Sequence, residues 1–331
     1  MRWKLYAAVT MLVALGVAGL FTVWPAGHRP STAEILTVAE SRQIMSALLY
    51  IAMAERYCAD EGLEIILQPY PSGKASLRAV IDSKADIAAV AEVPFMWAVL
   101  DGRPVQVFAT IETTDKDIAI TARTEAGVTT AQDLAGKRIG IVPGTSTAYF
   151  FDLFLATHNL KESGVVAVPF EPTDMAPALA AGSIDAMSAG TAIRLQAHTQ
   201  LPDRTISFFG DGVYIEAWNL AARKTFLHER PAAMQKLLRA LLKAERFAGV
   251  NRQQAIDIVA RQLNLDLGTV AALWENFVFT ISLDQTLIVH LEGQTRTALQ
   301  ASPTTPLPNF LHHVYLDGLA AVAPHRVTIL H

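Results

Sequence analysis

A short run of hydroxyl residues is the strongest candidate in this chain for binding chemistry. Thr145, Ser146 and Thr147 follow Pro143-Gly144 at the end of a β-type run, Arg138–Val142, and open an apolar-periodic segment that predicts a helix. The first turn of a helix leaves backbone N–H groups unpaired and carries partial positive charge, so this junction suits a small oxyanion. Neither a nucleotide P-loop lysine nor a G-x-G-x-x-G motif is present. The alternative is that Thr145 or Ser146 only caps the helix.

Two further loops follow predicted strands, and ligands of doubly wound folds collect at the carboxyl ends of strands. Arg42 follows the first strand, and its planar guanidinium suits a carboxylate or sulfonate. The alternative for Arg42 is a solvated arginine in the first turn of a helix. Glu92 follows the strand Asp86–Val90 and is placed to accept a hydrogen bond from an amine or ring N–H. Alternatively, Glu92 caps the helix that begins near Pro94.

Two later segments add candidate contacts. Gly190 follows the strand that starts at Asp185 and permits close approach of the backbone to a ligand, or serves a tight turn. In a strand, Tyr214, Glu216 and Trp218 share one face, where an aromatic and an acid can stack on a ring or hold a cation. Ordinary strand packing is the alternative for Tyr214.

Composition narrows the classes of function. Of the 331 residues, 51% are apolar and 18% charged, which favours a buried core, and the net charge of −4 gives no case for nucleic acid. Cys58 is the single cysteine, which excludes an internal disulfide and a cysteine metal cluster. The nine histidines follow no metal-binding pattern, and Asp115 and Asp117 lie in a polar stretch without evident partners. We therefore expect no metal, no cofactor and no catalytic set.

The N-terminus predicts export. Arg2 and Lys4 precede an uncharged run, Leu5–Gly27, which is long enough to span a bilayer and lacks a clean cleavage site. We expect an uncleaved anchor with the rest of the chain on the extracytoplasmic face, in the periplasm, with a cleaved signal peptide as the close alternative.

From residue 34 onward, strand and helix patterns alternate, which favours parallel sheets covered by helices. The predicted elements are strands at Glu34–Ala39, Leu63–Gln68, Asp86–Val90 and Val105–Ile111, and helices at Ser41–Ala59 and Ser72–Lys84. The C-terminal third is helical from Pro231.

An internal repeat suggests two lobes built alike. Ala79–Ala88 and Ala178–Met187 both carry a helix end, a polar turn and then an aspartate, Asp86 or Asp185, one step into a strand. Chance similarity between two αβ hairpins is the alternative.

These segments together resemble a known family. The resemblance covers about Ile35 to Leu265 and is carried by Cys58–Ile65, Pro71–Gly73, Ala85–Ala88, Asp133–Ser146 and Pro172–Ala186. The chain is similar to the substrate-binding proteins of ABC importers for nitrate, sulfonates, taurine and thiamine-pyrimidine precursors, the SsuA/THI5-like or NMT1-like family.

The resemblance implies an α/β architecture, the type II periplasmic-binding-protein fold, with two doubly wound lobes joined by a hinge. The chain would cross between lobes near Ala119–Arg123 and Ala217–Ala221. The implied division is 1–33 for the signal or anchor, 34–119 and 219–331 for the first lobe, and 120–218 for the second. The resemblance implies cleft positions for Ser72, Gly73, Glu92, Thr145, Ser146 and Thr147.

The sequence departs from the family's pattern at one segment that bears on the class of ligand. Many relatives have a Trp-Glu-Pro-like segment where this chain has Ser188–Ala192, so the relatives' ligand cannot be carried over.

The expected function is capture of a small anionic or zwitterionic organic molecule by a monomer and its delivery to an ABC permease. The hydroxyl run would hold the anionic end with help from Arg42, while Glu92, Glu216 and Trp218 contact the remainder. An anchored ligand-sensing domain is one alternative. A thiamine-pyrimidine synthase-like enzyme is another, which the single cysteine disfavours.

Overall fold

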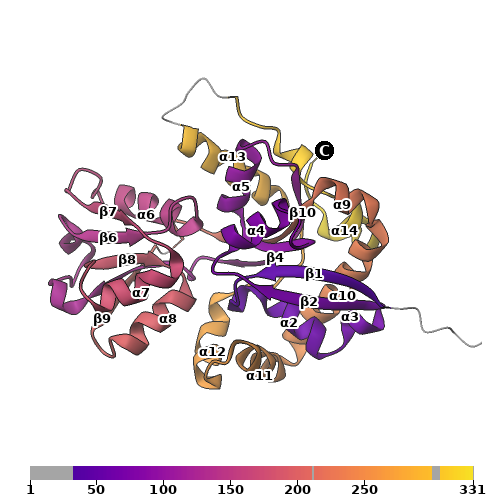
Figure 1. Cartoon of the computed structure of the whole chain (residues 1–331), viewed down its shortest axis with the longest axis horizontal. Helices are drawn as coiled ribbons and strands as arrows, with labels where there is room; N and C mark the ends of the chain where they lie inside the picture. Colours follow the sequence, from indigo (N-terminus) through magenta and orange to yellow (C-terminus); the bar gives the residue numbers. More distant parts are fainter. Residues whose placement is uncertain (1–32, 211, 300–305, 331) are drawn as a thin grey trace, which may run out of the picture. The chain divides into compact units, whose positions relative to one another are not determined.

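The computed structural model describes residues 33–210, 212–299 and 306–330 (Figure 1). The chain divides into two compact parts, Met1–Ala33 and Glu34–His331, and all that follows concerns the second. The apolar run predicted to serve export or anchoring lies outside the described residues. In the described part, none of the helices combines the length and apolar composition that a bilayer crossing requires.

A five-stranded sheet organises the first lobe, with strand order β2-β1-β3-β10-β4. Its strands are β1 (Glu34–Glu40), β2 (Leu63–Pro69), β3 (Ile87–Ala91), β4 (Val105–Thr114) and β10 (Glu216–Arg223). Strand β1 pairs in parallel with β2 and β3, whereas β10 runs antiparallel to β3 and β4. All of β3 is buried, as expected for a central strand covered on both faces.

A second five-stranded sheet repeats this plan, with strand order β7-β6-β8-β5-β9. Its strands are β5 (Ala119–Arg123), β6 (Arg138–Ile141), β7 (Val166–Pro169), β8 (Ala186–Ala189) and β9 (Thr205–Phe209). Strand β6 is parallel to β7 and β8, and β5 is antiparallel to β8 and β9. Each sheet therefore has four strands that run in one direction and one, β10 or β5, that runs against them, and the two lobes are built alike.

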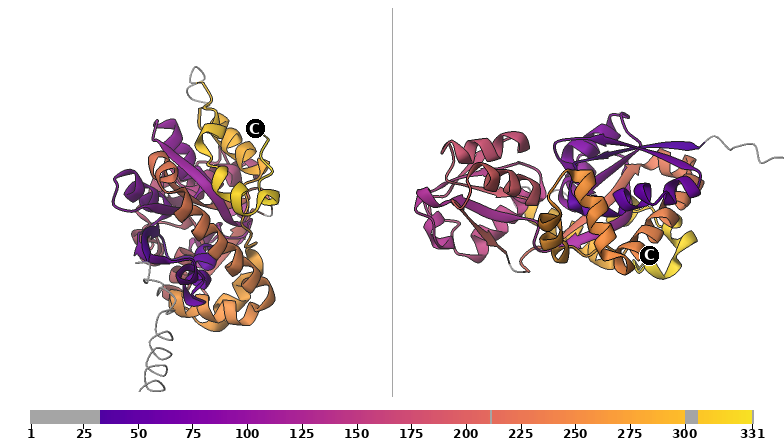
Figure 2. Two further views of the ribbon diagram at one scale, coloured as in Figure 1. Left: turned by 90° about the vertical axis from the view of Figure 1, so that its right-hand side faces the viewer. Right: turned by 90° about the horizontal axis from the view of Figure 1, so that it is seen from below.

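Helices cover both sheets. Around the first sheet lie α2 (Ala47–Ala54), α3 (Tyr57–Asp60), α4 (Gly73–Ile81), α5 (Glu92–Leu100), α9 (Lys224–Glu229), α10 (Pro231–Val250), α11 (Arg252–Leu263), α12 (Leu267–Leu273), α13 (Gln285–Ala298) and α14 (Asp317–Val322). The second sheet has α6 (Ser146–Thr157), α7 (Pro172–Ala180) and α8 (Thr191–Gln200). Figures 1 and 2 show the C-terminal helices gathered around the first sheet, and their apolar residues join its core.

Short 3₁₀ turns complete the described elements. They are η1 (Ile44–Ser46), η2 (Thr124–Ala126), η3 (Ala131–Leu134), η4 (Trp274–Asn276), η6 (Phe310–His313) and η7 (Pro324–Arg326).

The predicted single helix Ser41–Ala59 is wrong. The structure has η1, α2 and α3 in its place, because Arg42 (φ 51°) and Arg56 (φ 61°) are left-handed. A left-handed residue cannot continue a right-handed helix, so the helical part begins at Ile44 and breaks at Arg56.

The chain changes sheets before the positions expected from sequence. It leaves the first sheet after β4 and enters the second with β5, then leaves after β9 and returns with β10. Strand β5 therefore belongs wholly to the second sheet and β10 wholly to the first. The segments that connect the lobes precede these strands, at 115–118 and 210–215.

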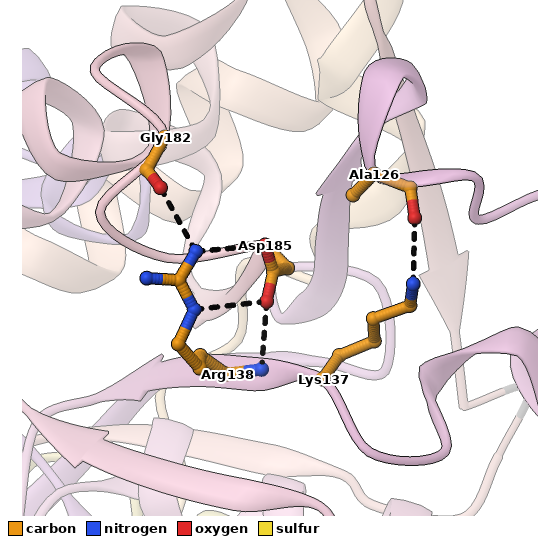
Figure 3. A network of polar contacts seen from close by, with 5 residues as sticks. All are labelled: Ala126, Lys137, Arg138, Gly182 and Asp185. Carbon is orange, nitrogen blue, oxygen red and sulfur yellow. Dashed lines mark hydrogen bonds and ion pairs between the residues drawn. The ribbon is translucent and has the colours of Figure 1, made fainter.

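The repeated aspartates hold neighbouring strands in register. Asp86 accepts from the Thr37 backbone N–H (2.8 Å), and Asp185 accepts from the Arg138 backbone N–H (3.0 Å). In the second lobe the Arg138 guanidinium also bonds both Asp185 oxygens and the Gly182 carbonyl (Figure 3), and it lowers the pKa of Asp185. Both aspartates precede their strands, so this contact lies at the amino ends of β3 and β8.

Candidate functional site

A cleft lies between the two lobes, with a cavity volume of about 80 Å³. A water molecule needs about 10–15 Å³ on this measure, so the cavity has room for a small solute. The cleft is lined by Gln43, Met45, Pro71, Ser72, Gly73, Lys74, Ala91, Pro94, Asp117, Val142, Thr145, Ser146, Thr147, Pro172, Gly190, Ala192, Ile193, Glu216 and Trp218. These residues come from loops at the strand ends of both lobes and from the connecting segments.

Most of the site residues predicted from sequence meet in this cleft. The lining includes Ser72, Gly73, Thr145, Ser146, Thr147, Gly190, Glu216 and Trp218. The structure thus brings together residues separated by as much as 146 positions, from Ser72 to Trp218. Their roles in binding a ligand stay predictions.

The N-terminus of α6 opens directly into the cleft. Thr145 occupies the N-cap position, but its side chain accepts no hydrogen bond from a backbone N–H of the helix. The Thr145 hydroxyl instead donates to the Val142 carbonyl (2.7 Å) and pairs with the Thr147 hydroxyl (2.9 Å). Ser146 is 3% exposed, and its hydroxyl has no hydrogen-bond partner among the described residues. The first turn of α6 is therefore not capped by a side chain of its own N-cap residue.

The opposite wall comes from the start of α4. Ser72 caps this helix by accepting from the Ala75 N–H (3.2 Å). Gly73 packs against Trp218, since a Cβ added to Gly73 would lie 2.9 Å from the indole ring. The Lys74 ammonium reaches across and donates to the Pro143 carbonyl (2.8 Å), in the loop that leads to α6. One direct hydrogen bond thus joins the two walls.

A second helix N-terminus, that of α8, is already occupied by a carboxylate. Asp117 is buried and accepts from the Thr191 backbone N–H (3.1 Å). Gly190 leaves room for it, because a Cβ there would lie 2.5 Å from Asp117 Oδ2. The buried Arg194 guanidinium donates to the Asp117 carbonyl (2.9 Å) and lies over the Phe209 ring.

Buried carboxyl groups gather beside this wall. Glu112 and Glu216 lie on paired strands, β4 and β10, where Trp218 stands opposite Glu112. Burial raises the pKa of Glu112 well above its ordinary value, and Glu216, Asp117 and Glu92 raise it further. Burial likewise raises the pKa of Glu216, with added repulsion from Asp117 and Glu92. In the part of the chain that the structure describes, both Glu112 oxygens and Glu216 Oε2 lack hydrogen-bond partners.

Glu92 and Arg42 are the two predicted site residues that lie outside the cleft lining. Glu92 is fully buried, and its oxygens accept from the Tyr214 hydroxyl, the Ala217 N–H (2.9 Å) and the Gln294 amide (2.8 Å). It therefore fastens α5 to the segment that returns from the second lobe and to α13. Tyr214 precedes β10 and does not share a strand face with Glu216.

Arg42 is turned away from the cleft by its left-handed backbone. Its guanidinium donates to the Gln262 carbonyl (2.8 Å), and its backbone N–H donates to Glu40. It borders a smaller cavity beside Asp117 and Leu263 instead. A ligand contact from Arg42 or Glu92 stays a prediction.

Sequence reasoning missed Lys74, Asp117 and Glu112. Asp117 was expected to lack partners, which is wrong because Thr191, 74 positions later, supplies one. Lys74 directly follows the Ser72-Gly73 pair, so its place in the first turn of α4 was the available signal. Glu112 follows the mostly apolar run Val105–Ile111, and no residue near it in the sequence indicates a role in the site.

The fold and the cleft place this chain among known proteins. The family description "NMT1/THI5 like" matches residues 43–255, more than half of the chain. The chain belongs to the NMT1/THI5-like family. The resemblance deduced from the motifs is thereby confirmed.

Curated relatives match part of the chain. A Brucella abortus protein described as a binding protein is 27% identical over 147 residues, which cover 43% of this chain and 46% of that protein. The chain thus spans about half the length of the curated relatives it matches.

Solved structures share the fold. The alkanesulfonate-binding protein SsuA from Xanthomonas axonopodis pv. citri, bound to MOPS, has a TM-score of 0.74 at 19% identity over 85% of this chain and 98% of that one. A Candida albicans protein with the generic periplasmic binding protein fold has a TM-score of 0.66 at 15% identity, covering 89% and 96%. The desulfurization enzyme DSZB gives 0.64 at 16%, covering 88% and 99%. The predicted periplasmic-binding-protein fold is confirmed.

Proposed function

We propose that this chain is the solute-binding component of an ABC importer and captures a small anionic or zwitterionic organic molecule in its cleft. The observation that carries the proposal is the N-terminus of α6, which opens into the cleft and is not capped by the side chain of its N-cap residue, Thr145. Unpaired N–H groups and the helix dipole attract an anion there. The buried, unpartnered Ser146 hydroxyl adds a donor at the same place.

Closure of the lobes around the ligand would report its capture to a partner. The Lys74–Pro143 hydrogen bond supports this role, since it links the two walls of the cleft. Glu92, Tyr214 and Gln294 would form the fixed side of the hinge, because all three are tied together by hydrogen bonds.

The partner we propose is an ABC permease in the cytoplasmic membrane, served by a monomer on the extracytoplasmic side. Family membership and the likeness to SsuA support this assignment. Residues 1–33 would supply the export signal or anchor.

The residues that line the cleft favour reversible ligand binding over catalysis. Among the described residues that line the cleft there is neither a histidine nor a cysteine. Cys58 is buried in the first lobe, and burial raises the pKa of its thiol to about 12, which keeps it protonated and a poor nucleophile. The likeness to DSZB is one of fold and carries no reaction to this chain.

The test is a thermal-shift panel on the full chain, followed by calorimetry with each compound that raises the melting temperature. The panel contains ethanesulfonate, 2-aminoethanesulfonate, nitrate and 4-aminopyrimidine. Changing both Ser146→Ala and Thr147→Ala should weaken binding of a sulfonate about tenfold, because the Ser146 donor, worth about 0.5–1.5 kcal/mol, is lost and the Thr145–Thr147 hydroxyl pair beside it is broken.

Thr157→Ala is the matched control, since Thr157 is the last residue of the same helix and far from the cleft lining. It should leave affinity unchanged. Equal affinity of the double variant and the natural protein would contradict the anion site at α6. A panel without any binder would contradict the proposed function itself.

A further inference from the structure

A second cavity lies where the chain returns from the second lobe to the first, and it is called the hinge cavity below. Its volume is about 160 Å³, which is twice that of the cleft and roughly ten times what one water molecule requires on this measure. Its walls are α6 of the second lobe, α13 of the first lobe and the returning segment. It is lined by Tyr149, Leu153, Val213, Tyr214, Ile215, Val289, His290, Gly293 and Gln294, none of which lines the cleft.

A glycine hollows the wall that α13 contributes. Gly293 lies in the interior of this helix, where glycine is about 0.5–1 kcal/mol less favourable than alanine. Neither space nor backbone conformation requires a glycine there, since a Cβ added to Gly293 would meet nothing within 4 Å and its φ is not positive. Gly293 therefore leaves the hinge cavity open at a position where another residue would place a side chain.

Most of the lining is apolar or aromatic. Val289 and Ile215 are large apolar side chains, yet they are 58% and 44% exposed. The Tyr149 and Tyr214 rings meet edge to face, with centroids 5.6 Å apart. Among the described residues that line the hinge cavity, none is a lysine, arginine, aspartate or glutamate. A lining of this kind favours an aromatic molecule without net charge.

Two polar side chains of α13 add hydrogen-bonding capacity. The His290 ring makes no hydrogen bond or ion pair within the part of the chain that the structure describes. Gln294 is 3% exposed, and its amide nitrogen donates to Glu92 Oε1 (2.8 Å), which fixes the orientation of the amide. Gln294 Oε1 has no partner among the described residues. Since buried acceptors are rarely left unpaired, this side of the hinge cavity favours a hydrogen-bond donor.

We propose that the hinge cavity binds a small, neutral aromatic molecule that carries one hydroxyl or N–H group. The inference goes beyond the proposed function, because it adds a binding site that shares no lining residue with the cleft. The ring of the molecule packs against Tyr149 and Tyr214, over Gly293, and its donor group faces His290 and Gln294. Because the walls belong to both lobes, the bound molecule contacts both.

The experiment titrates the full chain with 4-fluorophenol and with 4-fluorotoluene and follows the ¹⁹F resonance of each compound. The two compounds differ by a hydroxyl group in place of a methyl group. Each is measured with the natural protein and with Gly293→Leu, whose side chain fills the hinge cavity. Gly249→Leu in α10 is the matched control, because a Cβ there also meets nothing within 4 Å and Gly249 does not line the hinge cavity.

The natural protein and Gly249→Leu should bind 4-fluorophenol saturably, and about three- to tenfold more tightly than 4-fluorotoluene, since one hydrogen bond contributes about 0.5–1.5 kcal/mol. Gly293→Leu should weaken binding of 4-fluorophenol about tenfold or more. If Gly293→Leu does not fold, Val289→Asp serves instead, since it places a charge on the exposed rim of the same lining.

Three results would overturn the inference. One is the absence of saturable binding of 4-fluorophenol to the natural protein. Another is an affinity that Gly293→Leu leaves unchanged, or that Gly249→Leu weakens equally, because the compound would then bind elsewhere. The third is equal affinity for the two compounds, which would contradict the hydrogen bond to α13.

Discussion

The N-termini of α6 and α8 face the same cleft but are treated in opposite ways. Both helices follow strands of the second sheet, β6 and β8, and both begin beside a threonine. At α8 the chain supplies its own anion, the Asp117 carboxylate, on the Thr191 N–H. At α6 the side chain of the N-cap residue, Thr145, bonds backward to Val142 and does not cap the helix. Of the two helix ends, that of α6 is therefore the one we propose for an external anion.

The surrounding charges sharpen this difference. The α6 loop is bridged by the Lys74 ammonium, whereas α8 borders Asp117 and, beyond it, the buried carboxyl groups. The side of the cleft at α6 therefore carries an ammonium, and the side at α8 carries acidic groups.

We expect the largest effect on stability at the N-terminus of α8, which Asp117 occupies. Gly190→Ala places a Cβ 2.5 Å from Asp117 Oδ2, so Asp117 and α8 must separate. Overpacking of this kind costs about 1–3 kcal/mol, and the melting temperature in thermal denaturation should fall by several degrees.

Gly249→Ala in α10 is the control, because a Cβ there meets nothing within 4 Å. It should be neutral or stabilising. If both variants melt alike, Asp117 does not depend on Gly190 for its place at α8.

We expect a smaller effect on stability from Glu112, one of the buried carboxyl groups beside the cleft. Folding raises the pKa of Glu112 through burial and through Glu216, Asp117 and Glu92, so the folded state binds more protons than the unfolded state. Stability from this group is therefore greatest below the unfolded pKa of 4.5 and declines as pH rises towards the folded pKa. Glu112→Gln removes that decline. Its melting temperature relative to the natural protein should rise between about pH 5 and pH 8.

Thermal denaturation across this range checks the prediction, with Glu64→Gln as an exposed control. A difference between Glu112→Gln and the natural protein that does not change with pH would mean that Glu112 has the same pKa in both states.

Local sequence patterns were sufficient to predict much of the fold and the part of the cleft that α6 contributes. Alternating strand and helix signals placed β1 to β4, and the hydroxyl run after Pro143-Gly144 placed the start of α6. The aspartates of the internal repeat, Asp86 and Asp185, occupy equivalent positions before β3 and β8. These features depend on residues close together in the sequence.

Contacts between distant residues could not be derived in the same way. Glu92 is buried because Tyr214 and Gln294, 122 and 202 positions away, take its oxygens. Asp117 finds its partner 74 positions later. The left-handed backbone of Arg42 also carries no signature, because that conformation is uncommon for arginine.

We propose that the anionic group of the ligand binds at the N-terminus of α6 and not at that of α8. The most direct test follows backbone amide resonances of the deuterated, ¹⁵N-labelled full chain during titration with 2-aminoethanesulfonate. We expect saturable shifts of the Ser146 and Thr147 amide resonances, while the resonance of the Thr191 amide, already bonded to Asp117, stays in place. Shifts at Thr191 with unmoved Ser146 and Thr147 amides would contradict it.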